Sequence, residues 1–557
     1  MQQFRVRSKA ALRRDLVTGV VLALLSVPLS MGFAMVAGLP PVYGIYGSLL
    51  TGLIFALLTG SPRYVFGVDA APAALVGTLL PSLGIAGGSP EAMAVMPVFT
   101  LLTAAWLFLF WALRGGRYAK FISEPVLGGC VSGIACIVLL GRLPTLFGGS
   151  AASGRAPALL THLLGEMSAF HPLSCLLGAG TLAVILLGRR WTRLSLSVIM
   201  MTAAVLSDYL LHWEALGVAV VGPLPAGLPS IARFDFSLLG SHAESFLVDS
   251  LAVALVIAAE TLVSTREVAR HYEEAVDGQK ELLAYTLANL AAAFLGSSPA
   301  SGSISRTVRV NRRQVSSQWM SVSACAATAL VLLFGTPLLA HLPVPVLTGI
   351  VIASLITMLE FPMALRLWRL ERSEFFIFTA AFGAELIGLA EGVIVGVLLS
   401  FASFTMRASS EPSYFLGVLR DEEGFHDLAQ TPHARPIAQT VLYQFTGPMF
   451  FANAEDFERD ILGALREDTR LVVVTGVSSL DMFAAERLLE LYRRLKSRGI
   501  HFYLSGHAGV VREQLVSYGA KELIRDGAVR QRLTQALAAG GVVPPYPLGN
   551  REKKKTQ

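Results

Sequence analysis

The 557-residue chain has little charge: only 15% of its residues are Asp, Glu, Lys or Arg, whereas 54% are hydrophobic. This balance excludes an ordinary soluble protein of the same length and indicates a membrane protein. The four cysteines lie in apolar runs without metal-ligand spacing, which favours small buried side chains over a metal site. A P-loop, an HExxH motif and a nucleophile elbow are all missing. The sequence therefore predicts a protein that is not an enzyme and that holds neither a metal nor a cofactor.

The charge is also uneven along the chain. Residues 1–400 hold 25 Lys/Arg and 21 Asp/Glu, or 46 charges, whereas residues 401–557 hold the remaining 20 and 18, or 38 charges in 157 positions. The density doubles near residue 407, which predicts a membrane-to-soluble boundary there. The predicted parts are a cytoplasmic N-terminus (1–14), a transmembrane domain (15–407), a linker (408–436), a small α/β domain (437–540) and a basic tail (541–557).

The membrane part contains twelve long apolar runs and two short segments, Ala70–Leu83 and Ser303–Arg313. A helix needs about 20 apolar residues to cross the bilayer core, so these two are too short to span it. Each is the third element of its half, which predicts fourteen elements in a seven-plus-seven inverted repeat with a binding site between the halves (about 15–221 and 246–407). The long runs lie near 16–37, 42–60, 92–113, 121–141, 172–188, 195–221, 246–265, 282–295, 319–339, 344–359, 374–390 and 392–406.

Basic residues support this count. With the N-terminus in the cytoplasm, segments assigned to the inside carry twenty-one Lys or Arg, whereas outside loops carry only Arg142, Arg155 and Arg233. The asymmetry agrees with the positive-inside rule and predicts that both termini are cytoplasmic. The first apolar run follows five basic residues, as in a signal peptide, but the many later runs indicate a retained span. The expected location is a bacterial inner or plasma membrane.

Arg306 is the exception, because it falls inside the membrane near the start of the second short segment. A helix of about ten residues is roughly 15 Å long, so its N-terminus should lie near the midplane. Ser301, Ser303 or Ser305 could cap this helix, and Asp69 could cap the first short one. Two helix N-termini that face each other beside a guanidinium form a site for an anion. The alternative is an ordinary cytoplasmic loop in which Arg306 only sets topology.

Three further arginines follow Arg306 within two helical turns: Arg309, Arg312 and Arg313. We expect them to face the cytoplasm and to contribute little to anion affinity. We expect Arg306 itself to contact the anion directly.

Several motifs resemble the SulP family of anion transporters, also called the sulfate permease family. The stretch SVPLSMGFAMVAGLPPVYGIYGSLLTGLIFALLTGSPRYVFGVDAA resembles its first signature, and AAETLVSTREVA with KELLAYTLANLAAAFLG and SGSISRT resembles its second. AEGVIVGVLLS resembles its last span. The segment from LGVLRDEEGF to NAEDFERDI resembles its junction into a C-terminal STAS domain. The resemblance covers nearly the whole chain.

The resemblance implies uptake or exchange of small anions such as sulfate, chloride, bicarbonate or dicarboxylates, by movement of a core domain against a gate domain. It also implies a homodimer and a cytoplasmic regulator at the STAS domain; no nucleic-acid partner is expected. In related STAS domains a Ser or Thr after an Asp can be phosphorylated, but Asp481 here precedes Met482. The implied substrate-binding residues are Ser30, Phe33, Asp69, Ala70, Ala71, Ser303, Ile304, Ser305 and Arg306.

Coupling to a second ion is expected at Glu260, Ser264 and Asp69. An ionisable residue in an apolar span is costly unless it has a partner, so Glu260 is a candidate for function. Sodium-coupled relatives carry an acidic residue and a hydroxyl at these positions, but tend to lack an arginine where Arg306 stands. The pattern therefore favours proton coupling or no cation over sodium. Glu260 as a structural partner of Arg306, and Asp69 as a helix cap, remain open.

Two other classes of function remain as alternatives. The STAS domain could make the protein a membrane-tethered signalling scaffold, which predicts no transport by the purified chain. A nucleobase permease could share the architecture, but its site needs hydrogen-bonding carboxylates rather than an arginine.

Overall fold

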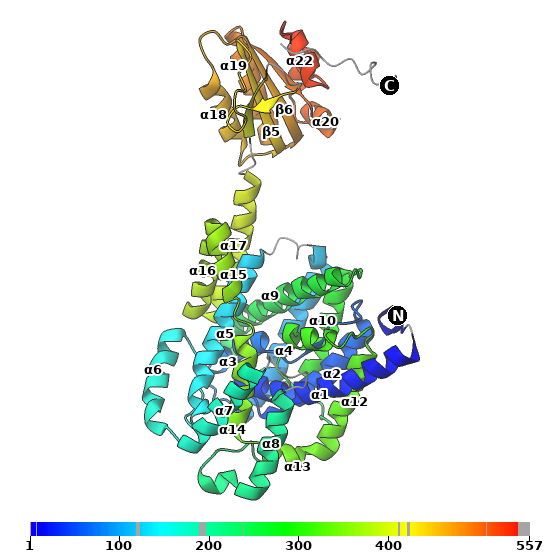
Figure 1. Cartoon of the computed structure of the whole chain (residues 1–557), viewed down its shortest axis with the longest axis vertical. Helices are drawn as coiled ribbons and strands as arrows, with labels where there is room; N and C mark the ends of the chain where they lie inside the picture. Colours follow the sequence, from blue (N-terminus) through cyan, green and yellow to red (C-terminus); the bar gives the residue numbers. More distant parts are fainter. Residues whose placement is uncertain are drawn as a thin grey trace. The chain divides into compact units, whose positions relative to one another are not determined.

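The structure, a computed structural model, describes residues 2–6, 8–117, 123–188, 196–237, 239–409, 413–419, 424–507 and 509–543 (Figure 1). Most of the predicted basic tail, residues 544–557, lies outside the described residues. The chain divides into two compact units, Met1–Ser403 and Phe404–Gln557. The division lies close to the change in charge density near residue 407.

Among the described residues between 9 and 409 lie the fourteen expected elements, seven in each half of this region. Eight helices of the described part are long and apolar enough to cross a membrane, and three shorter apolar helices accompany them. The first half consists of α1 (Lys9–Val36), α2 (Pro41–Leu58), α3 (Ala70–Ser82), α4 (Pro90–Ala112), α5 (Glu124–Leu146), α7 (Pro172–Gly188) and α8 (Leu196–Leu211). The second half consists of α9 (Leu239–His271), α10 (Gly278–Phe294), α11 (Ile304–Asn311), α12–α13 (Trp319–Leu330 and Thr336–Ala340), α14 (Val344–Ile356), α16 (Arg372–Ile387) and α17 (Leu389–Ser409).

The span expected over 195–221 is shorter than the sequence indicated, because α8 ends at Leu211. His212 adopts a left-handed backbone conformation with φ 47°. The Asp208 carboxylate accepts hydrogen bonds from the Trp213 backbone N–H (2.9 Å) and pairs with His341 Nδ1 (2.7 Å). These polar contacts turn the chain out of the helix. A short 3-10 helix, Trp213–Leu216, follows, and beyond it Val220 forms an isolated bridge with Pro343.

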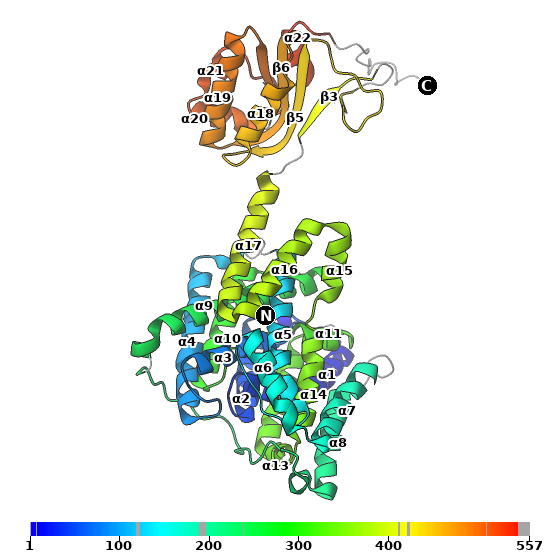
Figure 2. The same cartoon turned by 90° about the vertical axis from the view of Figure 1, so that its left-hand side faces the viewer.

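Helices of the two halves lie among one another: Figure 2 shows the blue and cyan helices of the first half between the green helices of the second. Their contacts form two groups. In one group α1 packs against α2 and α12, and α10 packs against α2 and α4. In the other group α5 packs against α16 and α14, and α14 also packs against α7. Both groups mix early and late helices, so neither half of the chain forms a separate body. Two more helices, α6 (Ala156–Glu166) and α15 (Phe361–Leu370), connect these elements.

A sheet of two very short strands joins the halves where the two short helices begin. β1 (Phe66–Gly67) pairs antiparallel with β2 (Ser301–Gly302), with Phe66 opposite Gly302 and Gly67 opposite Ser301. Both strands are buried. Glycine is needed at 302, because an added Cβ would lie 2.2 Å from the Tyr64 ring. The β1–β2 crossing, defined by these four residues, places α3 and α11 on either side of one backbone ladder.

The second unit is an α/β domain around a five-stranded sheet with strand order β4-β3-β5-β6-β7. Three strands run parallel to one another: β5 (Thr440–Met449), β6 (Leu471–Leu480) and β7 (His501–Ser505). β3 (Ser413–Gly417) pairs antiparallel with both of its neighbours, β5 and β4 (His426–Asp427). The sheet therefore begins inside the segment predicted as a linker. The domain's helices are α18 (Ala454–Ala464), α19 (Met482–Ser497), α20 (Gly509–Ser517), α21 (Lys521–Arg525) and α22 (Leu533–Ala539).

Each face of this sheet has its own apolar core. Phe457 of α18, Leu488 of α19 and Leu515 of α20 pack on one face with alternate residues of β5 and β6. Leu537 of α22 packs on the other. Asp481 caps α19 through a 2.7 Å bond from the Ala484 N–H, and its second oxygen accepts the Phe451 N–H. Asp481 thus has a structural role in the domain.

Candidate functional site

Helices α3 and α11 both begin at the β1–β2 crossing, so their free N–H groups gather in one place. Asp69 precedes α3 in an extended conformation, and its Oδ1 accepts the Ala70 N–H at 2.8 Å. Ser303 precedes α11 but makes no capping bond with its side chain. Of the three serines expected to cap α11, none does so. The first N–H groups of this helix are therefore available to a ligand, which is the condition for an anion site.

Arg306 is buried beside the crossing, with 2% of the side chain exposed. Its Nη2 donates a 2.7 Å hydrogen bond to the Val68 carbonyl and lies 3.5 Å from Asp69 Oδ2. The ion-pair partner of Arg306 is thus Asp69, not Glu260 as one reading of the sequence suggested. The guanidinium also fills the space over Gly67, where an added Cβ would lie 3.3 Å from Nη1. Arg306 holds the start of α3 against α11.

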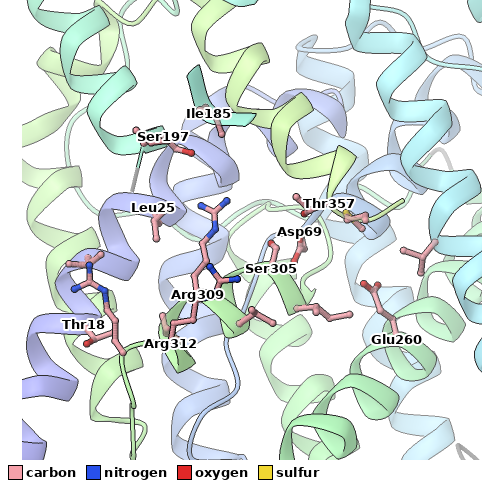
Figure 3. A pocket seen from close by; sticks show the side chains of 18 of the residues that line it. Thr18, Leu25, Asp69, Ile185, Ser197, Glu260, Ser305, Arg309, Arg312 and Thr357 are labelled. Atoms are coloured by element: carbon pink, nitrogen blue, oxygen red, sulfur yellow. The ribbon is translucent and has the colours of Figure 1, made fainter. Parts of the chain in front are cut away.

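A cavity of about 950 Å³ opens next to this crossing. Figure 3 shows its wall, in which Asp69 and Ser305 lie between the arginines of α11 on one side and Glu260 on the other. The lining residues are Thr18, Val21, Leu25, Asp69, Val131, Ile185, Leu196, Ser197, Glu260, Ile304, Ser305, Val308, Arg309, Val310, Arg312, Arg313, Thr357, Met358 and Glu360. Residues of α1, α9 and α11, with the N-cap of α3, thus meet residues of α5, α7 and α8 and of the segment that follows α14.

The cavity wall includes only part of the predicted substrate-binding set. Asp69, Ile304 and Ser305 line the cavity, whereas Arg306 does not. Ala70, Ala71 and Ser303 are buried in the adjoining first turns. These seven residues do lie together at the crossing, as the two short segments indicated.

Ser30 and Phe33 lie outside the cavity wall and are fully enclosed by protein. Ser30 Oγ is 2.7 Å from Ser48 Oγ, and Ser48 Oγ accepts the Val68 N–H at 3.2 Å. Ser30 is therefore connected to the crossing through Ser48 instead of facing the cavity.

The predicted coupling residues lie on α9 and the start of α3. Glu260 lines the cavity, and its Oε2 is buried without a hydrogen-bond partner among the described residues. Ser264 Oγ donates to the Glu260 carbonyl at 2.6 Å and also contacts the Tyr64 hydroxyl. Ser264 is thus already engaged with protein, while the Glu260 carboxylate faces the cavity together with Asp69.

Sequence reasoning missed several residues of this site. Arg309, Arg312 and Arg313 were expected to face the cytoplasm and were left out of the predicted site, yet all three line the cavity. Their spacing carried the signal, because Arg309 and Arg312 follow Ser305 at intervals of four and three residues on one helical face. Glu360 and Thr18 also line the cavity. They lie at the ends of apolar runs and have no comparable pattern.

Two buried carboxylates on the flanks hold the loops around the crossing. Asp15 of α1 accepts hydrogen bonds from Ser316 and Ser317, with the Ser317 hydroxyl at 2.7 Å. Glu281 of α10 accepts the Thr59 hydroxyl at 2.8 Å and the Gly60 N–H at 2.6 Å. Each carboxylate binds a segment more than two hundred residues away, so its role could not be predicted from the residues around it.

Comparison with known proteins agrees with this architecture. The model of the sulfate permease family matches residues 12–381, two thirds of the chain, and the STAS domain model matches residues 430–536. The chain belongs to the sulfate permease family. A probable sulfate transporter of Mycobacterium tuberculosis is 28% identical over 545 residues, covering 96% of this chain and 97% of the relative. Sulfate transporter 3.1 of Arabidopsis thaliana is 24% identical over 532 residues, with coverage of 90% and 80%.

Solved structures share the fold of this sulfate permease family member. The murine Solute Carrier 26 family member A9 anion transporter, in the inward-facing state, superimposes with a TM-score of 0.85 at 19% identity, covering 97% of this chain and 92% of the other. The transmembrane domain of a cyanobacterium bicarbonate transporter gives 0.62 at 17% identity, covering 72% and 100%. The family assignment and the fold class predicted from the sequence are therefore confirmed, with a STAS domain at the C-terminal end.

Proposed function

We propose that this sulfate permease family member is a secondary active transporter of small anions, in the class of sulfate, bicarbonate, chloride or dicarboxylates. One observation carries the proposal: two half-helices begin at a single crossing on the wall of a 950 Å³ cavity, and arginines line that wall. Helix N-termini and guanidinium groups both favour anions. A relative named as a probable sulfate transporter, which this chain matches over 97% of the relative's length, supports the same conclusion.

Transport would proceed by movement of the core helices against the gate helices. The cavity wall combines residues of α1, α9 and α11 and the N-cap of α3 with residues of α5, α7, α8 and the segment that follows α14. In the first packing group α9 packs on α4, α3 on α9 and α11 on α1, and in the second α8 packs on α14. A relative shift of the groups would open the cavity to alternate sides of the membrane while the crossing stays intact. We propose a homodimer with both termini in the cytoplasm of a bacterial cell, and a STAS domain that receives a cytoplasmic regulator.

Proton-coupled symport or anion exchange is favoured over sodium coupling. Glu260 presents a carboxylate oxygen that no described group bonds, so a proton can satisfy it without rearranging the wall. Ser264, which a sodium site would need, is already bonded to the Glu260 carbonyl. Sodium-coupled symport remains the second candidate, because Asp69 and Glu260 share one cavity and could together hold a cation.

Uptake into proteoliposomes tests these proposals directly. Labelled sulfate, bicarbonate, chloride and succinate would each be offered with and without an inward proton gradient, and then with a sodium gradient in its place. We expect uptake of at least one anion, stimulated by the proton gradient. Stimulation by sodium alone would favour the second candidate. Absence of both uptake and binding for all four anions would overturn the proposed function and favour a signalling scaffold.

A further inference from the structure

Helix α1 runs from the cavity into close packing with helix α14. Thr18 and Leu25 of its first half line the cavity, as Figure 3 shows. Further along the helix, residues 29–34 are all buried. Gly32 allows the close approach of α14, because an added Cβ would lie 2.1 Å from Val351 Cγ2. Beyond the cavity, helices of the two packing groups are therefore in direct contact.

Arg142 of α5 contacts the last turn of α1 beyond this packing. Its Nη2 donates a hydrogen bond to the Met35 carbonyl, which also accepts the Gly38 N–H at 3.0 Å. On α1, Met35 lies ten residues, or roughly 15 Å, beyond Leu25. On α5, Arg142 lies eleven residues beyond Val131, which also lines the cavity. Both helices place the contact at the end away from the cavity, which we call the closed end.

This hydrogen bond joins the two packing groups, since α1 belongs to the first and α5 to the second. Carbonyl groups in the last turn of a helix lack partners within it and carry a partial negative charge, so they stabilise a guanidinium beside them. Among the described residues Arg142 has no carboxylate partner, and the end of α1 is what offsets its charge. A shift of the groups that opens the closed end must break this bond.

Resting on the proposed function, we propose that Arg142 is a positioning residue that latches the closed end. Its bond to α1 favours the arrangement of the groups seen in this structure, and its release permits the opposite arrangement. Arg142 lies outside the cavity wall, so the bond acts on the equilibrium between the two states and not on contact with the anion. An arginine near a helix end also extends to the membrane boundary and sets topology, so the test must separate these roles from the latch.

The experiment measures how fast a water-soluble maleimide alkylates two reporter cysteines in the purified full-length chain. Val21→Cys reports access to the cavity. Val138→Cys reports access to the closed end, because Val138 is buried one helical turn before Arg142 on the same face of α5. Cys136→Ala and Cys175→Ala remove the two partly buried native thiols from every variant.

Each reporter is combined with Arg142→Gln, Arg142→Lys and the control Arg155→Gln. Arg155 is the exposed N-cap of α6, and its ion-pair partner is Glu391 at 3.8 Å, not α1. We expect Arg142→Gln to alkylate about tenfold faster at Val138→Cys, a shift of about 1.4 kcal/mol, and no faster at Val21→Cys. Arg142→Lys keeps the charge but loses the planar fork, so the rate at Val138→Cys should rise only about threefold. Arg155→Gln should match the parent at both reporters.

Two results would overturn the latch. One is an unchanged rate at Val138→Cys in the Arg142 variants. The other is a similar rise at both reporters, because a general loss of packing exposes both positions. If Arg142→Gln does not elute as monodisperse protein, the rate of Arg142→Lys decides.

Alkylation requires no anion, which keeps this inference separate from the proposed function. If the parent transports none of the four anions, the proposed function fails whatever the two rates are. If the parent transports them while both Arg142 variants alkylate like the parent, only the latch fails.

Discussion

Replacing Arg306 by glutamine tests whether the ion pair with Asp69 holds the two half-helices together. The substitution removes the 2.7 Å hydrogen bond to the Val68 carbonyl and leaves the Asp69 carboxylate without its cation. Breaking a buried ion pair by removing one partner costs about 3–5 kcal/mol, because the remaining charge is left unpaired. With 2% and 10% of the two side chains exposed, solvent can do little to offset that cost. Arg306→Gln should lower the thermal unfolding temperature by roughly 5 °C or more.

Anion affinity should fall as well, for a reason different from direct contact. Asp69 lines the cavity, and without Arg306 its full negative charge opposes an incoming anion. We expect a roughly tenfold to hundredfold loss of affinity, equivalent to about 1.4–2.8 kcal/mol. Adding Asp69→Asn removes the uncompensated charge, so the double variant should recover about 1–3 kcal/mol of stability and most of the affinity.

The assay combines thermal unfolding in detergent with anion titration for the parent, both single variants and the double variant. Arg270→Gln is the control for the stability measurement, because Arg270 is an exposed arginine of α9 that does not line the cavity. If Arg306→Gln unfolded like the parent, the ion pair would not hold the crossing. If the double variant bound anion no better than Arg306→Gln, the lost affinity would reflect direct contact with Arg306, as the sequence suggested.

Three further predictions concern coupling and the soluble domain. Glu260→Gln should abolish the dependence of uptake on the proton gradient and change anion affinity little, because the amide keeps the shape of the carboxyl group but cannot bind and release a proton. If uptake by the variant kept its full dependence on the gradient, Glu260 would have a structural role only. Deleting residues 412–557 should reduce the rate or the surface level and leave anion preference unchanged, since Met1–Ser403 has its own core; a shifted preference in competition uptake would contradict this. The hydrogen bonds from Lys496 and Tyr492 lower the pKa of Asp526 to about 2, so its contribution to stability is present above about pH 4 and is lost as the pH falls towards 2. Asp526→Asn should therefore unfold at a lower temperature than the parent at pH 6, with the difference closing towards pH 2 in thermal melts of the soluble domain; a constant difference would refute the assignment.

The elements of the membrane domain were largely predictable because the bilayer imposes a simple rule on length and polarity. The short segments after Asp69 and Ser303 stood out for that reason, and their pairing followed from their matching positions. The end of α8 was not predictable, since it depends on the Asp208 carboxylate reaching Trp213 and His341. Apolar composition continues beyond that point, and only the folded contacts show the turn.

The position of the site could be predicted from the sequence, but several of its side-chain contacts could not. Asp69, Ser305 and Glu260 line the cavity as expected. The partner of Arg306 could not be read from one sequence, because several acidic residues are available and only the fold brings Asp69 to 3.5 Å. Arg309 and Arg312 were set aside because charge at a membrane boundary usually reports topology. The four-residue interval from Ser305 to Arg309 and the three-residue interval from Arg309 to Arg312 were the information that should have outweighed that rule.

The pairing of β1 with β2 also determines when the membrane domain can complete its fold during synthesis. Gly67 pairs with Ser301, so 234 residues must still be added after the first strand leaves the ribosome before its partner exists. At about 5–20 residues per second, that interval is roughly 12–47 seconds. During this interval the backbone N–H and C=O groups of Phe66 and Gly67 lack their partner strand, and the hydrocarbon core of the bilayer offers them no hydrogen bonds. The early helices must therefore keep this segment in contact with water or with the insertion machinery until the second half arrives.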